Sequence, residues 1–91
     1  MNSKILQINL NRSASATENV LQLAIELNIS ILAIQEPWVV KADNSSVYRS
    51  INHNSFTQIF PNYGPYRPRT LFYISNKIRA NLVYTLSLIH I

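Results

Sequence analysis

The first regular pattern along the chain is an alternation of apolar and polar positions in residues 4–10, KILQINL. Every second residue from Leu6 to Leu10 is apolar, whereas Gln7 and Asn9 fall between them. This period of two is typical of a β-strand with one buried face. We therefore predict a strand here, with Gln7 and Asn9 on its polar side.

A helix is predicted after this strand. Residues 15–18, Ser-Ala-Thr-Glu, have the form of a capping box, in which the hydroxyl and the carboxylate satisfy free N–H groups of the first turn. The helix should begin there, and Asn28 is suited to the left-handed residue that ends it. The i, i+3, i+4, i+7 spacing of a single apolar stripe is occupied by Val20, Leu23, Ala24 and Leu27. The pattern predicts about three helical turns.

Residues 29–34, ISILAI, are apolar at every position except Ser30 and rich in β-branched side chains, as in a strand covered on both faces. Strand, helix and strand make a βαβ unit, whose right-handed crossover makes the two strands parallel. The carboxyl ends of parallel strands meet at one edge of the sheet, where α/β proteins bind their ligands. We therefore expect Asn9, Asn11 and Glu36 to meet at one rim.

The rest of the chain is predicted to contain short strands and loops. Strand-like sequence occurs at 47–51 and 56–60, around a polar turn, at 70–75, and in a further candidate at 81–89. Residues 41–46 are polar and turn-rich, as in a surface loop. Residues 61–68 carry three of the four prolines and the only glycine, so they cannot form a helix. No repeat or linker divides the chain.

The composition indicates a folded domain, because 47% of the 91 residues are hydrophobic and only 13% are charged. The net charge of +4 is compatible with a polyanionic partner such as a nucleic acid. The absence of cysteine excludes disulfides and thiolate metal sites, and it fits a reducing compartment. The apolar segment 82–91 has about half the length that a membrane span needs, so we expect no membrane partner.

Glu36 carries the first functional hypothesis. A carboxylate that ends a buried strand beside amide side chains suits Mg²⁺, which takes one or two carboxylates and completes its shell with water and phosphate oxygens. The residues alone leave an alternative to the metal site open for each of these side chains. Glu36 can be a solvated strand end, and Asn9 and Asn11 can be amides that hydrogen-bond a loop.

Read together, residues 5–13, 31–38 and 56–75 resemble the beginning of the endonuclease domain of LINE-type, non-LTR retrotransposon polyproteins. That domain belongs to the endonuclease/exonuclease/phosphatase superfamily, with the apurinic endonucleases and DNase I. The most specific pieces are Asn-x-Asn-Arg at 9–12 and Gln-Glu-Pro-Trp at 35–38. The resemblance implies an α/β (α+β) fold, namely the N-terminal portion of a four-layer αββα sandwich of the DNase I-like type, opening with a βαβ unit.

The same resemblance implies roles for residues at the rim. Asn9 matches the strand-end asparagine that helps to position metal and phosphate, and Glu36 matches the metal-binding glutamate; both are thereby candidate catalytic residues. Asn11 stands where relatives have an aspartate or asparagine near the metal. The implied cofactor is Mg²⁺, with Mn²⁺ as a substitute, which polarises the scissile phosphate. The implied activity nicks target DNA and frees a 3′ hydroxyl that primes reverse transcription.

Three arginines are candidate contacts to the DNA backbone. Arg67 and Arg69 lie in a segment interleaved with Tyr63 and Tyr66, where guanidinium can pair with phosphate and aromatic rings can stack on bases. Arg12, in the Asn-x-Asn-Arg motif, is the third. The alternative is that proline and tyrosine stiffen a loop whose arginines are merely solvated.

The chain departs from the family pattern because residues 1–91 contain neither its Asp-x-Asn segment nor its closing Asp-His segment, so no general base can be assigned. We read 1–91 as a partial domain, truncated before its C-terminal half, with marginal stability, little or no activity and one uncovered sheet face. His53 and His90 are interpreted as incidental, since neither is expected near the rim. The implied partners are DNA and the remainder of the polyprotein with its reverse transcriptase, and the implied location is intracellular and nuclear.

Two alternatives to the nuclease hypothesis stay open. A non-catalytic remnant of a mobile element would share the same family resemblance. A small RNA-binding module of the RRM type would share the length, the basic charge and the strand-helix-strand opening. Residues 70–75 offer it Phe72 and Tyr73, but no glycine accompanies them and adjacent strand residues point to opposite faces.

Overall fold

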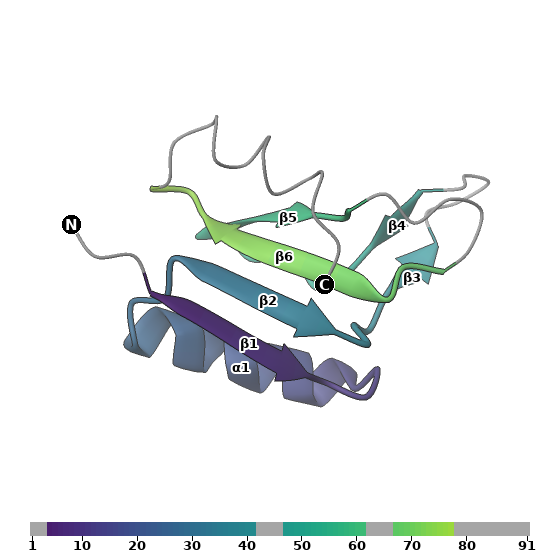
Figure 1. Cartoon of the computed structure of the whole chain (residues 1–91), viewed down its shortest axis with the longest axis horizontal. Coiled ribbons are helices and arrows are strands. Elements are labelled where there is room, and N and C mark those ends of the chain that lie inside the picture. Colours follow the sequence, from purple (N-terminus) through teal and green to yellow (C-terminus); the bar gives the residue numbers. More distant parts are fainter. Residues whose placement is uncertain (1–3, 42–46, 62–66, 78–91) are drawn as a thin grey trace.

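The computed structural model describes residues 4–41, 47–61 and 67–77 (Figure 1). A four-stranded sheet in the order β1-β2-β6-β5 carries α1 on one face, and β3 and β4 form a separate two-stranded ribbon. The elements are β1 (Ile5–Asn9), α1 (Ala14–Glu26), β2 (Ile31–Gln35), β3 (Val40–Lys41), β4 (Tyr48–Arg49), β5 (Phe56–Ile59) and β6 (Thr70–Ser75). The protein is a small mixed α/β protein, and to that extent the predicted fold class is confirmed.

The predicted βαβ unit is present. β1 and β2 are parallel neighbours, with Ile5 opposite Ile31 and Asn9 opposite Gln35. β6 is antiparallel to β2 on its other side, and β5 is antiparallel to β6, so the sheet is mixed. β1 and β2 therefore end side by side, at the edge where the rim was expected.

The N-cap of the helix lies two residues before the predicted one. Ser13 is the N-cap, with an extended backbone, and its hydroxyl accepts the N–H of Ala16 at 3.1 Å. The predicted start at Ser15 is therefore wrong. Ser13, which comes directly after the turn, already has the extended backbone that an N-cap needs. The predicted end is confirmed, since Asn28 is left-handed with φ 56°.

The buried side of α1 also differs from the predicted stripe. Leu23 and Leu27 are 43% and 46% exposed, so their assignment to the buried stripe is wrong. Two stripes of similar spacing overlap on this helix, and packing selects the one that includes Thr17, whose hydroxyl donates to the Ser13 carbonyl at 2.8 Å and is thereby satisfied. The residues that α1 buries are Thr17, Val20, Leu21 and Ala24.

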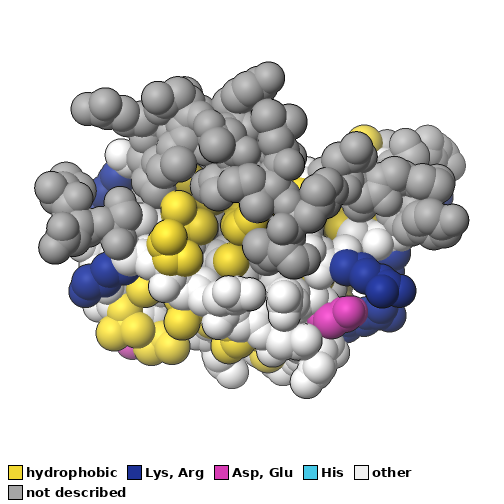
Figure 2. Space-filling model, viewed as in Figure 1, with side chains coloured by type: hydrophobic (Ala, Val, Ile, Leu, Met, Phe, Trp, Pro, Cys, Tyr) yellow, Lys and Arg dark blue, Asp and Glu magenta, His cyan; other side chains and the backbone are white. Residues whose placement is uncertain are grey.

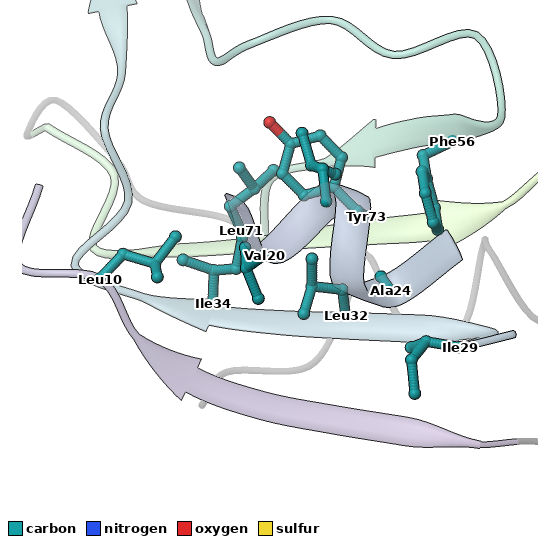
Figure 3. Packing of buried hydrophobic residues seen from close by; sticks show 10 residues of the cluster. Leu10, Val20, Ala24, Ile29, Leu32, Ile34, Phe56, Leu71 and Tyr73 are labelled. Atoms are coloured by element: carbon teal, nitrogen blue, oxygen red, sulfur yellow. The ribbon is translucent and has the colours of Figure 1, made fainter. Parts of the chain in front are cut away.

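The main core lies between α1 and the sheet (Figure 3). Along each central strand, residues of this core alternate with residues of a second buried set on the opposite face of the sheet. Tyr73, for example, belongs to the helix-side core, and its neighbour Phe72 belongs to the second set. The core on the helix side includes Leu10, Val20, Leu21, Ala24, Ile29, Leu32, Ile34, Phe56, Leu71 and Tyr73, and the second set is Ile31, Ala33, Phe72 and Ile74. No member of the second set is more than 5% exposed, so the expectation of an uncovered sheet face is wrong for the central strands.

The predicted strands at 47–51 and 56–60 do not pair with each other. β4 pairs with β3, and β5 pairs with β6. A side chain links them instead: Gln58 accepts the N–H of Ser50 at 2.8 Å and donates to the carbonyls of Ser50 and Ile51. The buried Tyr73 hydroxyl also donates to Ile51, at 2.7 Å. These bonds hold residues 50 and 51 against the sheet.

Some predictions fall on residues outside the described ranges. They are the loop residues 42–46, most of the proline-rich loop with Tyr63 and Tyr66, the strand candidate at 81–89, and His90. The strand predicted at 70–75 is confirmed as β6. Within the described part of the chain, no helix has the length and apolar character needed to cross a membrane.

Candidate functional site

The ends of β1 and β2 form the rim that the βαβ pattern predicted. Asn9 lies opposite Gln35, so Glu36 is one residue beyond Asn9 on the neighbouring strand. Adjacent strands lie about 5 Å apart, so the backbone positions of the two residues are neighbours at this edge. The prediction that Asn9 and Glu36 share one edge of the sheet is confirmed.

The chain leaves β1 through a tight turn. The N–H of Ser13 donates to the carbonyl of Leu10 at 3.0 Å, and the two residues between them, Asn11 and Arg12, are left-handed with φ 49° and 61°. Positive φ at both central positions is the property of a type I′ turn. The Asn9 side-chain oxygen accepts the N–H of Asn11 at 2.9 Å and so braces the turn from its start. Asn9 therefore has a structural role, as the loop-bonding alternative expected.

Glu36 directly follows β2 and has a left-handed backbone, φ 52°. Its N–H donates to the carbonyl of Arg69 at 3.0 Å, and its own carbonyl accepts the N–H of Arg12 at 2.8 Å. A left-handed conformation costs a residue with a Cβ about 1 kcal/mol, and such strain persists only where neighbours impose it, often at functional sites. Here the two neighbouring segments impose it through main-chain hydrogen bonds.

The Glu36 carboxylate is paired with Arg12. Arg12 Nε donates to Glu36 Oε2 at 3.1 Å, with the two side chains 51% and 34% exposed. In Figure 2, basic side chains gather beside an acidic one on the side of the molecule where β1 and β2 end. Sequence reasoning missed this pair, although the opposite charges at two adjacent strand ends were a signal that could have revealed it.

The other two predicted DNA-contacting arginines border the same rim. Arg69 is exposed, and its main chain is hydrogen-bonded to Glu36. Arg67 donates from a terminal nitrogen to the carbonyl of Val39 at 3.0 Å, which braces the segment that follows Glu36. Among the described residues, three arginines therefore border this edge beside one carboxylate, and such an excess of positive charge favours anions such as phosphate.

The residues at the rim fit Mg²⁺ in part. The carboxylate of Glu36 and the amide oxygens of Asn9 and Asn11 are hard oxygen ligands of the kind that Mg²⁺ prefers. Two of these oxygens already accept a hydrogen bond, namely Oε2 of Glu36 from Arg12 and the Asn9 side-chain oxygen from Asn11. The described ranges contain no group of three or more acidic, histidine or cysteine side chains that could hold a metal. The site they form therefore offers one carboxylate, with water and phosphate left to fill the remaining positions.

His53 lies away from the rim. It precedes β5, whose first residue, Phe56, pairs with Ser75 at the end of the sheet where β2 begins. Its Nδ1 accepts the N–H of Ser55 at 3.0 Å, and its ring meets Phe56 edge to face at 5.7 Å. This geometry supports the interpretation of His53 as an incidental histidine away from the rim.

The aromatic residues of β6 do not form an exposed platform. Phe72 and Tyr73 are buried on opposite faces of the sheet, 3% and 0% exposed. An RRM-type module binds RNA through aromatic rings on an open sheet face. The described sheet therefore offers no such surface at these two positions.

Comparison with protein-family models, with curated proteins and with solved structures finds no match for this chain.

Proposed function

We propose that this chain supplies the first two strand-end residues, Asn9 and Glu36, of a magnesium-dependent DNA endonuclease of the endonuclease/exonuclease/phosphatase type. We further propose that the complete domain is a four-layer sandwich of the DNase I-like type, that it belongs to a LINE-type retrotransposon, and that it nicks target DNA, as the resemblance of the sequence motifs implies. The chain would act with the remainder of the polyprotein, including its reverse transcriptase, on nuclear DNA.

One observation carries the proposal: Glu36 is held in a strained, left-handed conformation at the carboxyl edge of the sheet, beside the turn that follows Asn9. A solvated strand end would relax to an ordinary backbone unless its neighbours prevented it. Strain that is maintained by two main-chain hydrogen bonds, at the edge where α/β sheets bind ligands, favours a functional position over an incidental one.

The charges around Glu36 suit a phosphodiester. Arg12, Arg67 and Arg69 supply guanidinium groups that pair with phosphate oxygens. A bound Mg²⁺ would supply Lewis-acid stabilisation of the phosphate, with Glu36 as its carboxylate ligand. Asn9 would keep the turn in place by accepting the Asn11 N–H through its side-chain oxygen, and it would present its side-chain NH₂ group to the substrate.

The 91-residue chain is expected to have little or no nuclease activity by itself. The described residues offer no histidine or aspartate at the rim that could serve as a general base, since His53 lies at the other end of the sheet. A base must reach its proton within hydrogen-bonding distance. The proposal therefore concerns a binding site first and catalysis only in the context of a larger domain.

Manganese titration of the ¹⁵N-labelled 91-residue chain tests the site. Paramagnetic Mn²⁺ should broaden the amide resonances of Asn9, Asn11 and Glu36 before the others, and Mg²⁺ should shift the same resonances. The isosteric variant Glu36→Gln is the matched control, and it should lose the selective broadening. Uniform broadening in both proteins would contradict a cation site at Glu36.

Two further measurements address catalysis and the remnant hypothesis. Supercoiled plasmid incubated with the chain and Mg²⁺ should stay largely intact, and nicking that disappears in Glu36→Gln would contradict the expected inactivity. A cooperative thermal melt followed by circular dichroism is expected from a folded domain. A chain without a melt would favour a remnant that has lost its structure.

A further inference from the structure

Arg12 contacts Glu36 through both its main chain and its side chain. The main-chain N–H of Arg12 donates to the Glu36 carbonyl at 2.8 Å, and Nε donates to carboxylate oxygen Oε2 at 3.1 Å. The left-handed φ of 61° at Arg12 belongs to the turn that brings this residue over the end of β2. The turn after β1 therefore binds the main chain of Glu36, the candidate metal ligand, and also places the Arg12 guanidinium on its carboxylate.

A guanidinium and a divalent cation cannot both hold the same carboxylate oxygen without strong repulsion, because like charges a few ångströms apart are costly even near the surface. The two oxygens of one carboxylate are close together, so a guanidinium on Oε2 also repels a cation that binds through the other oxygen, and cation binding at Glu36 is weakened until Arg12 leaves. The pair is half-exposed, and exposed ion pairs contribute only about 0.2–1 kcal/mol. Release of Arg12 from Glu36 therefore costs little free energy.

The terminal nitrogens of Arg12 have no hydrogen-bond partner in the part of the chain that the structure describes. They are free to bind an anion, and guanidinium binds phosphate oxygens through paired N–H groups. A phosphate bound beside Glu36 would draw Arg12 away from the carboxylate. The same residue would then weaken the binding of cations and strengthen the binding of the phosphodiester.

We propose that Arg12 is a positioning residue that occupies the Glu36 carboxylate in the ligand-free protein and transfers to the phosphate of bound DNA, so that the cation site opens when the substrate arrives. The inference rests on the proposed function, since it requires a cation site at Glu36. It adds a coupling between metal and substrate: each should bind more tightly in the presence of the other.

The test compares the wild-type chain with Arg12→Gln and Arg12→Lys. Mn²⁺ affinity is measured by the broadening of the Glu36 amide resonance, and the affinity for a short DNA duplex is measured by fluorescence anisotropy in Mg²⁺ at fixed salt. Arg12→Gln should bind Mn²⁺ up to about fivefold more tightly, the factor that corresponds to the ion pair, and DNA several-fold more weakly. Arg12→Lys retains a cation near the carboxylate, so its Mn²⁺ affinity should stay within about twofold of the wild type.

Opposite changes in the two affinities distinguish this role from a purely structural one, because a damaged rim would weaken both. A melting temperature close to that of the wild type shows that each variant is folded. Mn²⁺ binding at Glu36 that Arg12→Gln leaves unchanged or weakens would overturn the inference and leave the proposed function standing. Wild-type and Arg12→Gln chains that both fail to bind Mn²⁺ at Glu36 would overturn both.

Discussion

Arg12 and Glu36 are joined by a main-chain hydrogen bond of 2.8 Å, and both have left-handed backbones. The bond connects the turn after β1 to the residue that ends β2, so each strained residue helps to hold the other. Because Glu36 also donates its N–H to Arg69, this position is anchored to the segments on both sides of β2. Substitutions at these residues can therefore separate backbone strain from side-chain chemistry.

Glu36→Gly and Glu36→Ala should differ in stability although both remove the carboxylate. Glycine adopts the φ of 52° without a Cβ clash, whereas alanine keeps the clash. We expect Glu36→Gly to be more stable than Glu36→Ala by about 1 kcal/mol in urea unfolding. Equal stabilities would indicate that residue 36 has an ordinary right-handed or extended backbone in solution.

Ser13→Ala and Ser15→Ala test which serine caps α1. Ser13 accepts the N–H of Ala16, whereas Ser15 lies inside the helix and is exposed. Loss of the cap should lower the free energy of unfolding by about 1 kcal/mol, and Ser15→Ala should change it by less than about 0.5 kcal/mol. The measurement is chemical denaturation. A larger loss of stability in Ser15→Ala than in Ser13→Ala would indicate that the helix is capped by the capping box at residues 15–18.

Leu21→Ala and Leu23→Ala form a matched pair on the same helix. Leu21 is 2% exposed in the core, and Leu23 is 43% exposed. The buried substitution should cost about 2–4 kcal/mol because it removes packing and leaves a cavity, and the exposed one should cost less than about 1 kcal/mol. Similar losses in thermal unfolding would mean that α1 packs through the stripe that contains Leu23.

Tyr73→Phe removes the hydroxyl that donates to the Ile51 carbonyl at 2.7 Å. At neutral pH the loss of this buried hydrogen bond should lower the free energy of unfolding by about 1 kcal/mol. Ile51 keeps its bond from Gln58, which limits the cost. The measurement is equilibrium unfolding in urea, with circular dichroism as the probe.

The same variant tests the burial of the phenol through its pH dependence. Burial raises the pKa of Tyr73 above its ordinary value of 10.0. Above pH 10 the unfolded chain therefore loses this proton before the folded protein does, and the free energy of unfolding falls as the pH rises. The stability advantage of wild type over Tyr73→Phe, which is complete below pH 10, should shrink above it. An advantage that is constant across this range would contradict the burial.

The local pattern of residues was enough to predict β1, β2, β6 and the existence of α1. Alternation in Leu6 to Leu10 and the apolar run at 29–34 reflect burial that each strand experiences along its own length, so a short window of sequence contains the signal. The shared rim of Asn9 and Glu36 also followed, because a βαβ crossover brings the ends of parallel strands together.

Tertiary structure alone decided the features that depend on which surfaces meet. Leu21 and Leu23 have the same chemistry, and only the placement of α1 on the sheet makes one buried and the other exposed. β5 pairs with β6 and not with the segment around Ser50, so that segment is joined to β5 by hydrogen bonds of the Gln58 side chain. The pairing of Arg12 with Glu36, and the left-handed backbones that permit it, arise only where two chain segments 24 residues apart are brought into hydrogen-bonding distance.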